Sequence, residues 1–270
     1  MNATEQRMLD MLKKGRERFG VVAIKAEFEA EGTRPDELQR LLELTYRADL
    51  KLALKIGGCE AVSDLHAAKL YGASYIIAPM VETPYALTKF IEAKDKVYGR
   101  DRGDAEFLFN LETATTLENL EGMISLARGN VDGLVFGRVD FTLSLGLERS
   151  AINQRQITNS VLLAAHGCAD HDLDLVVGGS VAVEAGPALR ETRRVRLDRF
   201  ETRKVVFDGT AVDGANFDAG IANAVEFELA WLQNKRDYYQ AIASEDLARI
   251  RMIEERQAAN KRQRLASVAA

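Results

Sequence analysis

Apolar segments of strand length alternate along this chain with longer segments whose apolar residues recur every three or four positions. The first pattern is typical of buried strands and the second of amphipathic helices. Strands are predicted at 21–28, 51–56, 75–80, 105–111, 131–137, 173–178 and 204–208. Helices are predicted near 35–48, 60–71, 84–96, 116–127, 151–167, 181–191 and 217–241. Because the strands are separated by single helices, the pattern predicts parallel pairing through right-handed crossovers.

Local start signals support several of these helices. Pro35 and Pro84 each fall at a first helical position. Thr33 and Thr83 stand close before them as capping hydroxyls. Thr115 begins a capping-box pattern for the helix near 116–127.

The alternation fits either a closed TIM-type (β/α)8 barrel or an open doubly wound sheet. The glycines after the first strand do not form a dinucleotide fingerprint, which disfavours the open sheet. Seven strands are recognised, so we expect a barrel with a missing or modified strand at its N-terminal seam. No linker rich in Pro, Gly or Ser divides the chain. We expect one α/β domain over 1–270, with a helix at 1–19, the barrel at 20–241 and an extra helix at 244–265.

The last of these helices carries Leu247, Ile250 and Ile253 on one side. Such a stripe packs either on its own subunit or against a second copy. The pattern does not favour one over the other.

Charged residues gather where the predicted strands end. Side chains alternate along a strand, so residues two positions apart share a face. Barrel enzymes keep their active sites at the C-terminal strand ends. Because charged residues are rarely buried without a partner, we interpret the set as an active site in preference to a ring of structural salt bridges. Its members are Lys25, Glu27 and Glu29 on the first strand, Lys55 on the second, Glu82 after the third, Asn110 and Glu112 on the fourth, and Arg138 and Asp140 on the fifth.

Two of these residues indicate metal chemistry. Glu112 and Asp140 each place a carboxylate at the tip of one of two consecutive predicted strands. Two such tips can hold one divalent cation between them, and a cation there can polarise a bound carbonyl.

Composition narrows the class of partner. The net charge of -5 disfavours nucleic acid, because phosphate binding requires a basic excess. Cys59 and Cys168 are far apart and lack metal-ligand spacing, so neither a disulfide framework nor a zinc site is expected. Residues 1–19 are charged and amphipathic, without an apolar stretch for a signal peptide or a membrane span. We therefore expect a cytoplasmic protein that acts on a small molecule and not at a membrane.

The histidines are predicted away from this face. His66 lies within a helix, and His166 and His171 lie between a helix and the strand after it. A general base is therefore a carboxylate, a lysine or a metal-bound water.

Two other stretches are ambiguous. Six arginines occur between 190 and 203, and Arg203 either grips a substrate anion or belongs to a solvated connection, the second being favoured. The Gly-Gly-Ser at 178–180 is a weak indication of an anion site.

Three segments in combination carry a family resemblance. They are 78–82, the Leu-Glu-Thr that ends at Thr113, and 131–137 with Asp140 and the Leu-Gly at 145–146. Over about 21–183 the chain resembles the HpcH/HpaI aldolase and citrate lyase β-subunit superfamily, which is related to the phosphoenolpyruvate/pyruvate barrel enzymes. The resemblance implies that Glu112 and Asp140 bind Mg²⁺ or Mn²⁺, which chelates a 2-oxo acid. Such a cation offsets the charge of the enolate left when a neighbouring carbon–carbon bond breaks.

The chain also departs from that family. An acid–histidine pair ends the matching first strand in the aldolases, whereas this chain has Glu27 and Phe28, and Phe28 cannot move protons. Lys55 stands where those enzymes have an arginine that grips the substrate carboxylate, so a point charge replaces a fork.

We therefore expect a divalent-metal-dependent carbon–carbon lyase or aldolase acting on a 2-oxo acid or a related carboxylate. The alternatives are a condensing enzyme with an enolpyruvate-type donor and a non-catalytic barrel that binds an anionic ligand. A homo-oligomer is expected from family habit. The expected roles are metal ligation by Glu112 and Asp140, carboxylate anchoring by Lys55, acid/base catalysis by Glu27 or Glu29, neutralisation of a second anionic group by Arg138, orientation of a metal-bound water by Asn110, and substrate contact by Glu82.

Overall fold

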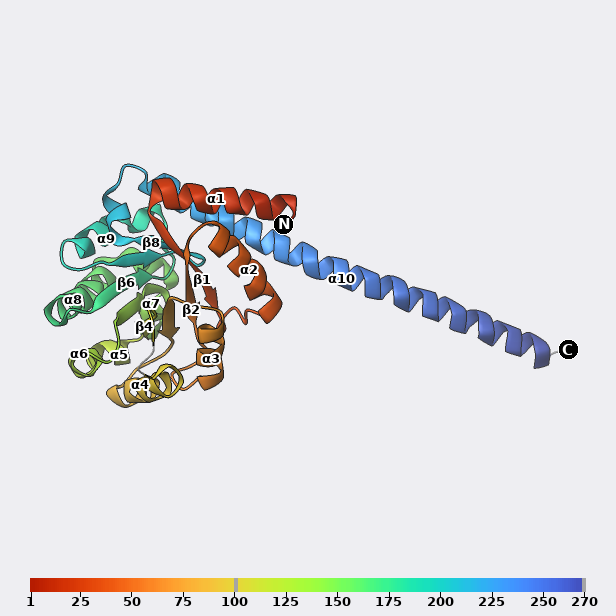
Figure 1. Cartoon of the computed structure of the whole chain (residues 1–270), viewed down its shortest axis with the longest axis horizontal. Coiled ribbons are helices and arrows are strands. Elements are labelled where there is room, and N and C mark those ends of the chain that lie inside the picture. Colours follow the sequence, from red (N-terminus) through yellow and green to blue (C-terminus); the bar gives the residue numbers. More distant parts are fainter. Residues whose placement is uncertain (100–101, 269–270) are drawn as a thin grey trace. The chain divides into compact units, whose positions relative to one another are not determined.

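A computed structural model describes residues 1–99 and 102–268 of the chain. Within these residues the strands form one closed barrel of eight in sequence order, surrounded by helices (Figure 1). The strands are β1 (Val21–Glu27), β2 (Lys51–Lys55), β3 (Tyr75–Ala78), β4 (Glu106–Leu111), β5 (Gly133–Gly137), β6 (Asp174–Gly178), β7 (Arg199–Glu201) and β8 (Val205–Asp208). The helices are α1 (Ala3–Phe19), α2 (Pro35–Arg47), α3 (Val62–Leu70), α4 (Pro84–Tyr98), α5 (Ala114–Glu118), α6 (Leu120–Ala127), α7 (Arg138–Ser144), α8 (Arg155–His171), α9 (Gly186–Arg193) and α10 (Phe217–Val268). Short 3₁₀ segments are η1 (Arg149–Asn153), η2 (Val183–Ala185) and η3 (Gly209–Asp213).

The predicted barrel is confirmed, but the irregularity at its seam lies in the last strands and not in the first. β1 is a seven-residue strand that pairs in parallel with β2. The strand missing from the prediction is β7, which pairs in parallel with β6. β8 pairs antiparallel with both β7 and β1, so the expectation of a parallel last strand is wrong. Only residues 202–204 separate β7 from β8, and parallel strands need a crossover of a dozen or more residues.

The helices differ from the prediction mainly at their ends. The helix expected near 116–127 is divided into α5 and α6, and α5 is capped by Thr113, which accepts from the Thr116 amide, and not by Thr115. Thr83 caps α4 as expected, whereas α2 follows Arg34 and not a Thr33 cap. The helices expected at 217–241 and 244–265 form one continuous element, α10.

Side chains that point into the barrel form two layers of different character. The lower layer is apolar, and it packs residues from β1 to β6 and β8 that include Ala23, Tyr75, Leu108 and Val176. The upper layer consists of polar and charged residues two or four places further along the strands, such as Lys25, Lys55 and Glu112. The barrel is thus a filled core that carries its polar groups at the C-terminal strand ends.

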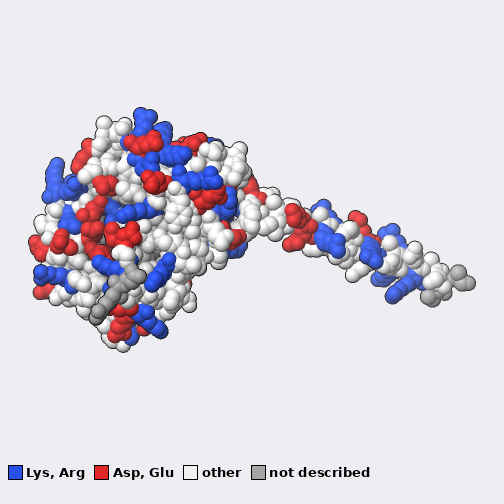
Figure 2. Space-filling view, viewed as in Figure 1, with Lys and Arg blue, Asp and Glu red and all other residues white. Residues whose placement is uncertain are grey.

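The chain divides into two compact units, Met1–Glu228 and Leu229–Ala270. The first contains the barrel and the pocket described below, and the second consists of the remaining turns of α10. Acidic and basic side chains are interspersed over the face that Figure 2 shows. No helix in the described part of the chain combines the length and the hydropathy needed to cross a membrane.

Candidate active site

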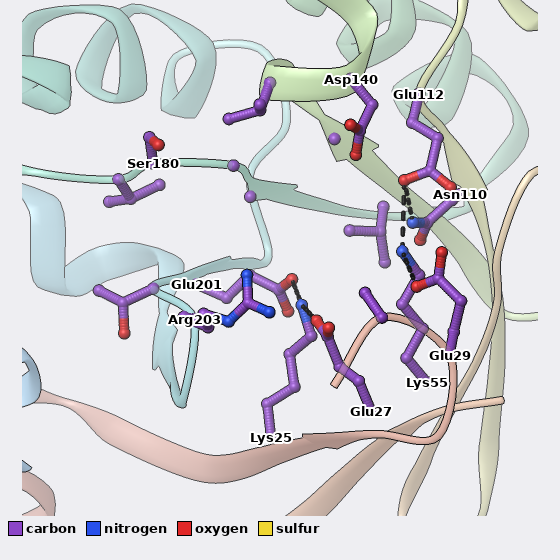
Figure 3. A pocket seen from close by; sticks show the side chains of 18 of the residues that line it. Lys25, Glu27, Glu29, Lys55, Asn110, Glu112, Asp140, Ser180, Glu201 and Arg203 are labelled. Atoms are coloured by element: carbon purple, nitrogen blue, oxygen red, sulfur yellow. Dashed lines mark hydrogen bonds and ion pairs between the residues drawn. The ribbon is translucent and has the colours of Figure 1, made fainter. Parts of the chain in front are cut away.

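A pocket of about 590 Å³ opens at the C-terminal ends of the parallel strands. Figure 3 shows two groups of charged side chains in it. The first, called here the Glu112 cluster, consists of Glu29, Lys55, Asn110, Glu112 and Asp140. The second, called the Lys25 cluster, consists of Lys25, Glu27 and Glu201.

Glu112 is fixed by donors from three directions. It follows β4 and is 2 % exposed. One carboxylate oxygen accepts from the backbone amide of Met80 at 2.9 Å. The other accepts from Asn110 Nδ2 at 2.5 Å and from Lys55 Nζ at 3.4 Å. Met80 adopts φ 49°, a conformation that is uncommon for a non-glycine residue and often occurs at functional sites. The carboxylate is therefore held in one orientation before any ligand binds.

Asp140 reaches the pocket from a helix and not from a strand. β5 ends at Gly137 and the chain becomes helical at once in α7, where Asp140 lies in the first turn. Its carboxylate points toward Glu112 in the same part of the pocket (Figure 3). Gly137 makes this approach possible, since a Cβ there would lie 2.9 Å from Glu112 Cβ and 3.0 Å from Glu112 Oε2. The structure thus brings together the two carboxylates that the sequence suggested as metal ligands.

Two further buried oxygen atoms in this cluster make no hydrogen bond to the described residues. They are Asn110 Oδ1 and Glu29 Oε2, although Glu29 Oε2 is 3.1 Å from Lys55 Nζ. Such a set of hard oxygen donors is of the kind that Mg²⁺ and Mn²⁺ accept. Residues 1–99 and 102–268 contain no group of three or more His, Cys, Asp or Glu side chains arranged around a metal position.

The Lys25 cluster places one ammonium between two carboxylates. Lys25 Nζ lies 3.0 Å from Glu27 Oε1 and forms a hydrogen bond to Glu201 Oε1. All three residues are at most 8 % exposed. Burial opposes charge on Lys25, but the two carboxylates together outweigh it and hold its pKa above the ordinary value. Burial likewise opposes charge on Glu27, and Lys25 with weaker help from Lys55 and Arg203 holds the Glu27 pKa below its ordinary value. Lys25 and Glu27 are therefore both charged at neutral pH.

Glu201 is a pocket residue that the sequence pattern did not predict. It ends β7, which is only three residues long. Gly178 leaves room for it, because a Cβ there would lie 2.9 Å from Glu201 Oε1. Gly137 and Gly178 are register partners on β5 and β6. Two adjacent strands thus each end in a glycine that admits a glutamate from a neighbouring strand. A glycine at the end of each of these strands is the sequence signal by which the two close approaches could have been predicted.

Arg138 and Glu82 do not lie where the sequence predicted. Arg138 is 2 % exposed, lies behind the pocket wall, and donates to the carbonyl oxygens of Gly179 at 3.0 Å and Ser180 at 3.3 Å. Burial without a carboxylate partner lowers its pKa to about 10. Glu82 accepts from the Thr113 hydroxyl at 2.7 Å. Neither residue is among those that line the pocket. Arg138 does not follow strand alternation, because β5 has already ended at Gly137.

Three further charged residues reach the pocket rim. Arg203 lines the pocket from the β7–β8 turn and donates to Glu31 Oε1 at 3.2 Å. Arg149 also lines it and donates to the Ser180 hydroxyl at 2.6 Å. Glu228 lines it from α10. The three histidines do not line the pocket, as expected, but His166 and His171 lie within α8 and not in the segment after it. His66 lies on α3.

Comparisons with known proteins agree with this architecture. Residues 43–185 match the model of the HpcH/HpaI aldolase/citrate lyase family. An HpcH/HpaI aldolase from Desulfitobacterium hafniense DCB-2 has a similar fold, with TM-score 0.56 and 10% identity over 76% of this chain and 84% of that one. An HpcH/HpaI aldolase/citrate lyase family protein from Burkholderia cenocepacia J2315 gives TM-score 0.58 and 14% identity over 88% and 90%. RipC from Yersinia pestis gives TM-score 0.51 and 16% identity over 77% and 88%. None of the curated proteins matches the sequence significantly. The matched region contains Glu112 and Asp140 and ends before Glu201.

Proposed function

Because the chain belongs to the HpcH/HpaI aldolase/citrate lyase family, we propose that it is a divalent-metal-dependent carbon–carbon lyase for a 2-oxo acid or a related carboxylate. The observation that carries the proposal is the convergence of the Glu112 and Asp140 carboxylates on one part of a pocket at the C-terminal strand ends. Mg²⁺ or Mn²⁺ would be held by these two residues. When bound, the cation would offset the negative charge that develops on the substrate's keto oxygen.

The charge of the pocket supports a dication. Among the described residues that line it, six carboxylates stand against four lysine and arginine side chains. The excess of two negative charges is what one divalent cation neutralises. Unneutralised carboxylates at close quarters would repel an anionic substrate.

Other residues of the pocket have separate tasks. Lys55 attracts the substrate carboxylate, while its contacts with Glu29 and Glu112 hold its ammonium at the pocket floor. Asn110 fixes the Glu112 carboxylate through Nδ2 and offers Oδ1 to a bound water. Glu27 or Glu29 transfers protons, because the histidines lie outside the pocket.

The test is metal-dependent exchange of the pyruvate methyl protons with D₂O, followed by NMR. We expect exchange with Mg²⁺ or Mn²⁺ in the wild type and its loss in Glu112→Gln, with a lowered Mn²⁺ affinity measured by calorimetry. The control is Glu92→Gln, which alters an exposed glutamate of α4 that pairs with Lys89. Mn²⁺ binding without exchange would instead favour a barrel that binds an anionic ligand without turnover.

A further inference from the structure

Two members of the Lys25 cluster, Lys25 and Glu201, have no task in forming an enolate at the Glu112 cluster, yet they line the same pocket. The Lys25 cluster lies at the ends of β1 and β7, whereas the Glu112 cluster is built on β2, β4, α7 and the loop after β1 (Figure 3). A lyase needs a second place for the fragment that is released. The Lys25 cluster is a buried polar part of the pocket outside the Glu112 cluster, and it is available for this fragment.

The ammonium of Lys25 carries one N–H group more than the number of protein acceptors around it. An ammonium carries three N–H groups. Among the described residues the structure gives it two acceptors, Glu27 and Glu201, and Lys25 also lines the pocket. Each carboxylate approaches from a different strand, so the position of the nitrogen is fixed. The third N–H is thereby left for a ligand in the pocket.

We propose that Lys25 is a catalytic residue whose third N–H donates to the carbonyl oxygen of the aldehyde that the reaction releases or adds. Glu27 and Glu201 are positioning residues for the ammonium, and Glu27 also carries the proton. This inference rests on the proposed function, and it assigns the second reactant to an uncharged aldehyde.

The proposed cleavage is balanced in protons and electrons without any group from outside the pocket. In cleavage, the hydroxyl group on the carbon to be released gives its proton to the Glu27 carboxylate as the carbon–carbon bond breaks. The bonding pair passes to the 2-oxo acid fragment as its enolate. Glu27 then returns the same proton to the enolate carbon of the 2-oxo acid fragment. The products are an aldehyde and a 2-oxo acid, and no oxidant or further reactant is required.

Charge makes Lys25 suited to the role of a donor and not of a base. Negative charge grows on the hydroxyl oxygen as its proton leaves, and a fixed buried cation stabilises it there. The raised pKa keeps the ammonium protonated, and the lowered pKa keeps Glu27 ionised and able to accept. The carboxylates of Glu27 and Glu201 can also accept hydrogen bonds from hydroxyl groups of the aldehyde. Because they repel negative charge, they disfavour a phosphorylated aldehyde.

The test compares two reactions of the same enzyme in the presence of Mn²⁺. Pyruvate methyl exchange in D₂O requires the Glu112 cluster and the Glu27 carboxylate, whereas addition of pyruvate to an aldehyde also requires the Lys25 ammonium. Formaldehyde, glycolaldehyde and glyceraldehyde are offered, and the one that the wild type uses fastest is kept. In Lys25→Met we expect addition to fall about 10²–10³-fold, as for loss of one oxyanion donor, and exchange to fall less than about tenfold.

Two further variants serve as controls for charge and for the loss of a buried lysine. Lys25→Met leaves two buried carboxylates without their cation, so the double variant Lys25→Met/Glu201→Gln restores the cluster's net charge of one negative unit and is expected to show the same split. Lys94→Met is the matched control. Lys94 is also buried, but it donates to the Asn130 carbonyl oxygen outside the pocket, and its variant is expected to keep both reactions.

The outcomes separate this inference from the function beneath it. If the wild type shows neither reaction, the proposed function is rejected and the inference falls with it. If the wild type exchanges protons but adds none of the three aldehydes, the metal platform stands and the inference is overturned. It is also overturned if the folded double variant loses both reactions equally, or if it retains addition within about threefold.

Discussion

Replacement of Gly137 by alanine tests how closely the position of Glu112 controls the proposed chemistry. A Cβ at Gly137 would lie 2.9 Å from Glu112 Cβ, whereas ordinary contacts begin at 3.4 Å. Rotation of the Glu112 side chain cannot relieve this contact, because Cβ is attached to the backbone that follows β4. The φ of -87° at Gly137 suits alanine, so the effect is steric and not conformational.

The expected magnitude follows from that overlap. Relief requires a shift of about 0.5 Å, and since a 1 Å misplacement can cost about 10²-fold in rate, kcat/KM should fall about tenfold. Overpacking should also lower the free energy of unfolding by about 1–3 kcal/mol. The assays are pyruvate proton exchange with Mn²⁺ titration and urea denaturation.

The control for this variant is Gly58→Ala, because a Cβ at Gly58 would meet no atom within 4 Å. Wild-type kcat/KM and wild-type Mn²⁺ affinity in a folded Gly137→Ala protein would refute the reasoning. It would mean that the exact position of Glu112 does not limit the reaction.

Three other predictions address charge and proton transfer. Lys55→Met should raise the KM for the 2-oxo acid while Mn²⁺ still binds in calorimetry, and an unchanged KM would remove Lys55 from substrate capture. Because Lys25 holds the Glu27 pKa below its ordinary value, this carboxylate stabilises the fold above its unfolded pKa, and the effect is lost as the pH falls through its folded pKa. The difference in unfolding free energy between the wild type and Glu27→Gln should therefore be largest near pH 7 and shrink below about pH 4, and urea titrations that give the same difference at both would contradict it. Activity should survive simultaneous replacement of the histidines, and a large loss of kcat in the folded triple variant would show that the pocket recruits one of His66, His166 and His171.

Strand alternation was sufficient to predict most of the pocket floor. Lys25, Glu27, Lys55, Asn110 and Glu112 all line the pocket, as their shared parity predicts. These residues lie on or directly after regular strands, where side-chain direction follows from backbone geometry alone. The same rule fails once the strand has ended.

Arg138 and Asp140 illustrate that failure. The chain is helical from Arg138 onward, so side chains two positions apart no longer share a face. Asp140 faces the pocket and Arg138 turns behind it. No apolar pattern marks this change, because α7 is only seven residues long.

The composition of the short strand β7 does not identify it as a strand. It consists of Arg199, Phe200 and Glu201 within an arginine-rich segment that is typical of a solvated connection. Its charges are buried by tertiary partners: Arg199 contacts Glu106 at 2.8 Å at one end of the barrel, and Glu201 contacts Lys25 at the other. Local sequence does not reveal such partners, since Lys25 is separated from Glu201 by 176 positions. Because β8 reverses direction directly after β7, its antiparallel direction could not be predicted once β7 was not recognised.

The reversed direction of β8 restricts how this barrel can acquire new specificity. In a barrel of eight parallel strands, the segment after the last strand starts beside the active site and can be lengthened there. Here β8 ends with Asp208 at the opposite face of the barrel. On the pocket face, the connection between β7 and β8 consists only of residues 202–204. Extensions after β8 would therefore begin far from the reacting groups. Engineering of substrate range is better directed at the segments that follow β1, β3 and β6, which already supply Glu29, Met80 and Ser180 to the pocket.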